Sequence, residues 1–280
     1  MMWSVLCGLA STVFAVQDGE VELRIVHTND THSCVMPVNP NSSDTALADK
    51  GGFVRRAALV RDLRAEDPDL LLFDSGDFSQ GSAYYNLYKG DVEVKLMNEM
   101  RYDAATIGNH EFDFGLDNMA RIFREATFPI VCANYHFEGT VLEGLVRPYV
   151  ILERKGVKVG VFGLGTQLEG MVASENYKGV TYEDPVTAAN RVADELKNKE
   201  HCDLVVCLSH LGWDIDGLDD TELVPATRHI DIVLGGHSHT YFEHPEVLKD
   251  ADGEDVYCNQ MGKHGRYVGM LLLEMSPTGD

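Results

Sequence analysis

The chain is short of basic residues, because its 280 residues include 23 Lys and Arg against 45 Asp and Glu, a formal net charge of -22. A partner with a phosphate backbone needs basic patches, so this balance argues against binding to a nucleic-acid polymer. Repeats and low-complexity tracts are absent from the sequence. The six cysteines form no CxxC pair and no dense framework, so they predict no disulfide pairing. With 44% hydrophobic and 24% charged residues, the composition is that of an ordinary globular protein.

The first sixteen residues, MMWSVLCGLASTVFAV, carry no charge and are mostly apolar. They are shorter than the roughly 20 residues that a membrane-spanning helix needs, and no later segment is apolar enough to cross a membrane. Small residues around Val13-Phe14-Ala15 fit a signal-peptidase site, although the basic start of a signal peptide is missing. We interpret residues 1–15 as a signal peptide and expect a periplasmic or extracellular protein, with a buried N-terminal strand as the alternative. Residues 16–280 then form one domain.

Strand-like and helix-like segments take turns along the chain. An amphipathic pattern after Gly51-Gly52 predicts a helix, and Tyr149–Glu153 and Val157–Phe162 flank a Lys155-Gly156 turn as in a hairpin. Further strands are expected at 21–26, 70–73, 104–107, 129–133, 204–208, 230–234, 256–261 and 267–275, and further helices at 92–100, 116–126 and 185–199. Many buried strands separated by helices predict an α/β domain.

Polar residues with metal-binding side chains follow five of these strands. The five segments read HTNDTH, DSGD, GNHE, LSH and GGHSH, and offer Asp30, His32, Asp77, Asn109, His110, His210, His237 and His239. An isolated Asp-x-His is more often a cap or a turn, whereas two imidazoles at positions i and i+2 of an extended chain point to the same side. Because the carboxyl ends of strands in an α/β sheet meet at one crevice, we expect these side chains to converge. Their oxygen and imidazole nitrogen atoms suit a pair of divalent ions.

At these motifs the chain resembles the metallophosphoesterase superfamily, in particular its 5'-nucleotidase branch. The resemblance rests on HTNDTHS, DSGDFSQGS, GNHEFDFG, LSHLG and GGHSHT in the family's order, and the tail QMGKHGRYVGMLLLEM is similar to that branch's closing strands. It covers essentially the whole chain after the N-terminal segment. The resemblance implies a four-layer α/β/β/α sandwich of two mixed sheets that face each other, with a dinuclear metal site at the strand ends.

The resemblance also implies a role for each motif residue. One metal ion would be held by Asp30, His32, Asp77 and His239, and a second by Asp77, Asn109, His210 and His237. Asp77 would bridge the two divalent ions, which are expected to be Mn, Zn, Co or Mg. Several relatives carry Gln or Asn at the position of His239, so the metal preference of this chain is open. His110 and Asp113 match the branch's catalytic dyad.

Elementary chemistry supports the dyad independently. As an imidazolium, His110 can stabilise phosphoryl oxygens or protonate a leaving alkoxide, and Asp113 three residues later can orient the ring and raise its pKa. The alternative for His110 is a simple helix cap. We interpret Glu111 as a residue that holds loop amides and His27 as a structural residue beneath the site. The remaining histidines at 136, 201, 229, 244 and 264 carry no motif and are expected on the surface or in the core.

The expected function is hydrolysis of a phosphoester, most simply of a nucleotide, by water activated between two metal ions. A 2',3'-cyclic phosphodiester, a nucleotide sugar or a thiosulfonate are alternative substrates, and a non-catalytic module that keeps the fold is the alternative from another class. Nucleotidases of this branch carry a C-terminal domain that stacks the base and contributes arginines. A separate chain with that domain would complete the site here. Tyr84, Tyr85 and Tyr88 are expected either to line a base-binding wall or simply to pack.

Overall fold

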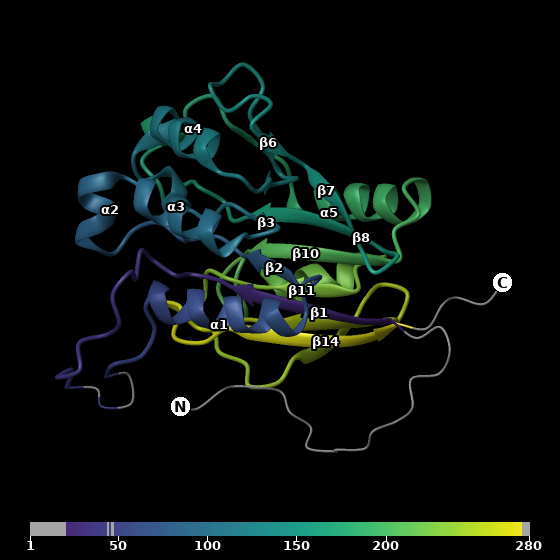
Figure 1. The fold of residues 1–280 in the computed structure, drawn as a ribbon. Coiled ribbons are helices and arrows are strands. Elements are labelled where there is room, and N and C mark those ends of the chain that lie inside the picture. The colour runs from purple at the N-terminus through teal and green to yellow at the C-terminus, as the bar shows by residue number, and fades with distance from the viewer. Residues whose placement is uncertain (1–20, 44, 46–47, 276–280) are drawn as a thin grey trace.

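Two six-stranded mixed sheets form the centre of the computed structural model, which describes residues 21–43, 45 and 48–275 (Figure 1). The first sheet has the order β14-β1-β2-β3-β4-β6, and the second has the order β12-β13-β11-β10-β8-β7. The strands of the first sheet are β1 (Val21–Thr28), β2 (Leu71–Asp74), β3 (Ala104–Ala105), β4 (Ile130–Val131), β6 (Val146–Arg147) and β14 (Gly269–Met275). Those of the second are β7 (Tyr149–Arg154), β8 (Val157–Gly165), β10 (Leu204–His210), β11 (Ile232–Leu234), β12 (Glu246–Lys249) and β13 (Asp255–Asn259).

Helices and short turns connect the strands. The helices are α1 (Phe53–Glu66), α2 (Ala83–Tyr88), α3 (Asp91–Met100), α4 (Gly115–Glu125), α5 (Pro185–Asp194) and α6 (Asp220–Leu223). The shorter helical turns are η1 (His110–Phe112), η2 (Ser174–Tyr177), η3 (Glu195–Lys199) and η4 (Val224–Ala226), and β5 (Tyr135–His136) pairs with β9 (Thr181–Tyr182) as a small separate sheet. No helix among the residues described combines the length and the apolar character that a membrane span requires.

The alternation of side chains along the strands explains the layers. In β10, Val206 packs with strands of the other sheet, whereas Val205 and Cys207 pack under α5 on the outer face. The same holds in β2, where Phe73 joins the inter-sheet core and Leu72 joins the core under the helices of the first sheet. Strands buried on both faces need cover on both sides, so helices lie outside each sheet. The expected four-layer α/β/β/α arrangement is therefore confirmed.

Most expected elements are present, with changes at their ends. The hairpin of β7 and β8 is antiparallel, and the helix that begins at Pro185 continues through η3 to Lys199. The strand expected at 104–107 pairs only at Ala104–Ala105, because the chain then turns toward the loop at Gly108. The segments expected at 129–133 and 230–234 likewise keep only β4 and β11 as paired strands. The interpretation of residues 1–15 as a signal peptide falls outside the residues described.

Candidate metal centre

The candidate ligands lie where the parallel strands of both sheets end. Strands β1, β2 and β3 run parallel in the first sheet, and β10 and β11 run parallel in the second. The Ser75 hydroxyl after β2 donates to the Leu234 carbonyl at the end of β11 at 2.7 Å, which ties the two strand ends together. The predicted convergence of the motif segments is therefore observed.

The first group consists of Asp30, His32 and His239, whose ligand atoms all lie within 4.8 Å of one another. The Nε2 atoms of His32 and His239 are 3.0 Å apart, and Asp30 Oδ1 lies 3.8 Å and 3.4 Å from them respectively. Asp30 is also held in place, because it accepts the Asn29 side-chain amide at 2.6 Å and the His237 backbone N–H at 3.0 Å. Two imidazole nitrogens and a carboxylate facing one point are a suitable donor set for a divalent cation.

The second group consists of Asp77, His210 and His237, again with ligand atoms within 4.8 Å of one another. The Nδ1–H of His210 donates to the Ser75 carbonyl at 2.7 Å, so the ring presents Nε2, which lies 3.1 Å from Asp77 Oδ2. That Nε2 atom and the side-chain oxygen of Asn109 are buried without a hydrogen-bond partner among the residues described. The Asn109 oxygen is thus an orphaned buried acceptor, which fits a metal ion.

The charges of Asp77 and His210 are strongly coupled. Burial alone would raise the pKa of Asp77, but His210 lowers it well below its usual range. Burial alone would lower the pKa of His210, but Asp77 raises it to about 10 overall. Without a cation, the imidazolium therefore balances the buried carboxylate, and a bound cation would take over that balancing charge.

Glu111 holds the loops that carry the second group. Its carboxylate accepts backbone N–H groups from Asp77 at 2.9 Å, Ser79 at 3.0 Å and Gly108 at 2.7 Å. Burial raises the pKa of Glu111 to about 7, and the Asp77 carboxylate adds to the rise. The sequence-based interpretation of Glu111 as a holder of loop amides is confirmed.

Two glycines let the strand ends approach each other. A side chain at Gly108 would collide with the Asp77 carboxylate, and one at Gly236 would place its Cβ 2.8 Å from both His210 Nδ1 and the Ser75 carbonyl oxygen. Both motifs therefore need glycine at these positions for close packing of backbone and ligand side chains.

The expected dyad is formed beside the two groups. His110 lies in η1, and its Nδ1 is 3.1 Å and 3.3 Å from the two Asp113 oxygens. Burial alone would lower the pKa of His110, but the hydrogen bond to Asp113 and the charge of Asp77 raise it overall. The His110 ring lies edge-on to the His32 ring with centroids 5.5 Å apart. Since Nδ1 is engaged, Nε2 is the ring atom left for a reacting group.

Of the residues near the two donor groups, some only pack in the core, whereas others contact the candidate site. His27 is fully buried with neither ring nitrogen hydrogen-bonded to the described residues, which agrees with its expected structural role. Tyr85 is buried, and its hydroxyl donates to the His110 carbonyl at 3.2 Å, whereas Tyr88 is half exposed. His264, expected on the surface or in the core, is partly exposed. Its ring lies 5.8 Å from that of His32, at the edge of the first group.

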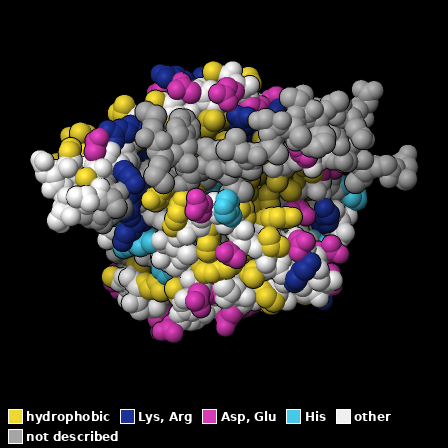
Figure 2. Space-filling model, turned by 90° about the horizontal axis from the view of Figure 1, so that it is seen from below, with side chains coloured by type: hydrophobic (Ala, Val, Ile, Leu, Met, Phe, Trp, Pro, Cys, Tyr) yellow, Lys and Arg dark blue, Asp and Glu magenta, His cyan; other side chains and the backbone are white. Residues whose placement is uncertain are grey.

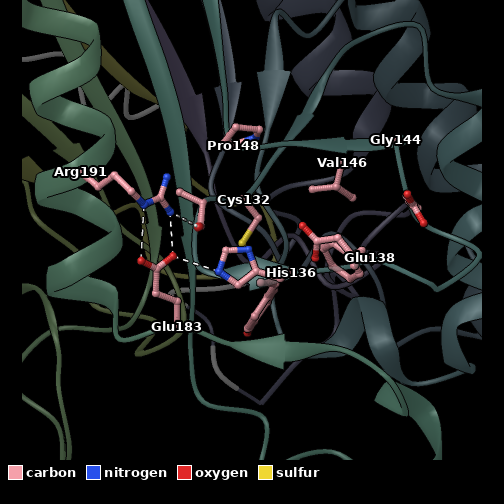
Figure 3. Close-up of a pocket in the computed structure, with 12 residues that line it drawn as sticks. Cys132, His136, Glu138, Gly144, Val146, Pro148, Glu183 and Arg191 are labelled. Atoms are coloured by element: carbon pink, nitrogen blue, oxygen red, sulfur yellow. Dashed lines mark hydrogen bonds and ion pairs between the residues drawn. The ribbon is translucent and has the colours of Figure 1, made fainter.

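A cavity of about 480 Å³ lies apart from this centre, between α5 and the β5–β9 sheet (Figure 3). Its polar side chains largely satisfy one another, because Glu183 binds both His136 at 2.9 Å and Arg191 at 2.7 Å. None of the candidate ligands lines it. The metal centre and this cavity are thus separate features.

Comparison with known proteins gives a family and a fold. The model of the calcineurin-like phosphoesterase family matches residues 23–241. The chain is 33% identical over 281 residues to human 5'-nucleotidase, covering 94% of this chain and 48% of that protein. Snake venom 5'-nucleotidase from Crotalus adamanteus is also 33% identical, with 95% of this chain and 47% of that protein covered.

Solved structures agree with this comparison. A 5'-nucleotidase precursor from Thermus thermophilus superposes with a TM-score of 0.81 and 33% identity, covering 90% of this chain and 51% of that one. An NAD nucleotidase from Haemophilus influenzae gives a TM-score of 0.80 at 26% identity, covering 93% and 48% respectively. The chain spans about half the length of the relatives that it matches.

Proposed function

The chain belongs to the calcineurin-like phosphoesterase family, and on that premise we propose that it is a metal-dependent phosphoester hydrolase that acts on nucleotides. The observation that carries the proposal is the convergence of two donor groups, Asp30-His32-His239 and Asp77-His210-His237, beside the His110–Asp113 pair. A non-catalytic module would not need a positioned proton donor next to orphaned ligand atoms.

Seven residues are proposed to hold two divalent ions. Asp30, His32 and His239 would bind one, Asn109, His210 and His237 the other, and Asp77 would bridge them. Bound there, two ions would supply an activated water and neutralise charge on the phosphoryl group. Imidazole makes up four of the seven donors, which suits Zn or Co better than Mg, a cation that prefers oxygen.

His110 and Asp113 are proposed to act on the substrate itself. Asp113 engages Nδ1, which orients the imidazole and favours its protonated form. The Nε2–H would then stabilise a phosphoryl oxygen and donate a proton to the leaving alkoxide. Phosphoryl transfer needs mainly such positioning and electrostatic stabilisation.

We propose 5'-nucleotides as substrates because the relatives matched are 5'-nucleotidases. A 2',3'-cyclic nucleotide and a nucleotide sugar are the substrates to compare with them. The chain spans about half the length of those relatives. We propose a nucleotidase C-terminal domain as the partner that completes base recognition. Export of the domain at 16–280 after removal of 1–15 is proposed as well, and N-terminal sequencing of the secreted protein would test it.

The proposed function is tested by removing metals with a chelator and restoring Mn²⁺, Co²⁺, Zn²⁺ or Mg²⁺ singly. Each form is then assayed with AMP, a 2',3'-cyclic nucleotide, a nucleotide sugar and p-nitrophenyl phosphate. We expect no hydrolysis without metal and recovery with at least one ion. An unaltered rate in the chelated protein, or no hydrolysis with any ion although two ions bind, would contradict the proposal.

A further inference from the structure

Residues 262–266, Gly-Lys-His-Gly-Arg, lie between β13 and β14, and we call them the basic loop. The loop is attached to the segment that carries the first ligands, because the His264 N–H donates to the Asp30 carbonyl at 2.7 Å. The Asn29 side-chain amide also donates to the Gly262 carbonyl at 2.8 Å. The His264 ring meets the His32 ring edge-on, as the His110 ring does. The basic loop is thus a wall of the metal centre.

Unpaired positive charge gathers at this loop. It carries Lys263 and Arg266, and Lys50 precedes Gly51, at which a Cβ would lie 3.1 Å from the His264 carbonyl oxygen. None of these three cations forms an ion pair with a carboxylate in the part of the chain that the structure describes, whereas twelve other Lys and Arg residues do. Lys50 lies 6.0 Å from the Tyr267 ring centroid, and Arg266 Nε donates to the Lys263 carbonyl at 3.0 Å. Their remaining N–H groups, together with the Lys263 ammonium, are the donors that this loop offers to an anionic ligand.

A buried cation lies directly under the loop. Arg56 is 3% exposed, and none of its three guanidinium nitrogens has a hydrogen-bond partner among the residues described. It lies against Gly265, where any side chain would collide with it. The guanidinium lies over the Phe53 ring with Cζ 4.0 Å from the ring centroid, but no carboxylate forms an ion pair with it among the residues described. An anion bound above the loop would therefore reduce the cost of burying this charge.

Positive side chains also gather on one part of the surface. In Figure 2, Lys and Arg side chains gather next to histidines at the left of the face, the side on which the segment after β1 lies in Figure 1. Acidic side chains are spread over the rest of that face. An anionic substrate that approaches a protein of net charge -22 needs such a local region to overcome the general repulsion.

We propose that the basic loop is a second anion subsite, which holds a phosphoryl group on the leaving-group side of the substrate through Lys263, His264 and Arg266. The proposal rests on the proposed function, since it describes another part of the same site. It predicts that substrates with a phosphorylated leaving group bind better than those with a neutral one. Charge-assisted hydrogen bonds from Lys and Arg are the usual means of holding phosphate.

A comparison of ADP with AMP separates a phosphorylated leaving group from a neutral one. When the terminal phosphoryl group of ADP is cleaved, the water oxygen bonds to that phosphorus and the bridging P–O bond breaks. The electron pair of that bond stays on AMP, the products are orthophosphate and AMP, and the proton from water is released. The leaving group of ADP is therefore an anion, whereas that of AMP is the uncharged nucleoside adenosine.

The experiment compares KM for ADP and for AMP in the metal-loaded full chain, with products separated by chromatography. In the double variant Lys263→Gln/Arg266→Gln, we expect KM for ADP to rise about 10- to 100-fold, as for the loss of one or two hydrogen bonds between charged groups. KM for AMP should change by less than about threefold, since its leaving group makes none of these bonds. The matched control is Lys95→Gln/Lys199→Gln, which removes two exposed charges outside the site and should leave both KM values unchanged.

The possible outcomes distinguish failure of the proposed subsite from failure of the proposed function on which it rests. Equal increases in both KM values, lost at high salt, would show general steering by charge and overturn the subsite alone. An unchanged KM for ADP would also overturn it. If the unmodified chain hydrolyses neither nucleotide, the proposed function fails and the subsite with it. The single variant Lys263→Gln, expected to raise KM for ADP about 3- to 10-fold, serves if the double variant does not fold.

Discussion

At the scale of single residues, the candidate centre depends on unusual backbone conformations. Asp30, His32, Asp77, His237 and His239 all have positive φ, between 42° and 73°. This left-handed region costs a residue other than glycine roughly 1 to 3 kcal/mol, so it persists only where surrounding contacts impose it. Here the contacts are backbone hydrogen bonds between the loops, such as Asp30 N–H to the Gly76 carbonyl at 2.9 Å. Five strained positions in the two donor groups indicate that the geometry is preorganised.

Asp77→Asn tests the proposed bridging ligand. The amide keeps the shape of the side chain but removes the negative charge that two cations would share. We expect the variant to lose most bound metal and nearly all hydrolysis, measured by elemental analysis after dialysis and by phosphate release. Asp220→Asn is a useful control, because Asp220 is also buried but binds the Ser209 hydroxyl rather than the metal groups. Two ions per chain retained by Asp77→Asn, with activity intact, would refute the bridging role.

His110→Asn tests whether the imidazole transfers a proton. The variant should keep its metal content, because His110 belongs to neither donor group, and kcat for AMP should fall by roughly 10²- to 10⁴-fold. The fall should be smaller for p-nitrophenyl phosphate, whose nitrophenolate leaves without a proton. Asp113→Asn should produce the same pattern more mildly, since it removes only the orienting carboxylate.

The leaving-group dependence decides between two roles of His110. An equal loss for both substrates would mean that the ring acts as an electrostatic clamp rather than as an acid. Loss of a metal ion on substitution would make it a ligand. Both results are read from the same preparations by elemental analysis and initial rates.

At the scale of elements, the sequence predicts the helices and strands that a local pattern of residues determines. The continuous apolar run Leu204–Leu208 reads as a strand buried on both faces, and β10 is such a strand. Short strands such as β6 and β12 were not predicted, because their two to four residues are defined by partners far away in the chain. The same limit applies to His264, which reaches the site only because the basic loop folds back onto Asp30. The motif segments were predictable because each stands at the end of a strand or within a few residues after it.

At the pairing of β1 with β14, a histidine is fully buried without a hydrogen-bond partner among the residues described. His27 faces Gly269 across the ladder, and burial lowers the pKa of His27 to about 3. In the unfolded chain its pKa is near 6.5, so the unfolded state binds the additional proton as the pH falls below that value. Stability should therefore decrease from pH 7 to pH 5, by about 2 kcal/mol from this residue.

Urea unfolding of the metal-free protein at the two pH values would measure this loss. His27→Leu has no titrating group there, so it should lose about 2 kcal/mol less than the unmodified chain between pH 7 and pH 5. Substitution of the exposed His244 by Leu is the control and should leave the pH dependence unchanged. Parallel pH profiles for the unmodified chain and His27→Leu would show that His27 is protonated in the folded state as well.

At the scale of the whole molecule, two facts bear on what this domain can recognise: the charged groups at its site and the share of its relatives' length that it matches. The chain carries its own candidate metal groups, dyad and basic loop, and all of these are suited to phosphoryl groups rather than to a base. The nucleotidases that it matches are about twice as long. The groups described here therefore support a role for this part of the molecule in phosphoryl chemistry.

The isolated chain should consequently distinguish nucleotides by their phosphates and not by their bases. We expect AMP, GMP, CMP and UMP to be hydrolysed with kcat/KM values within about fivefold of one another, because the site groups described here suit the phosphoryl group that all four share. KM for each should lie toward the upper end of the common range of roughly 1 μM to 1 mM. Adding a separately produced C-terminal nucleotidase domain should lower KM for one base selectively, while p-nitrophenyl phosphate, which lacks a base, serves as the control. A strong preference of the isolated chain for a single base, with a low micromolar KM, would show that this domain recognises the base without a partner.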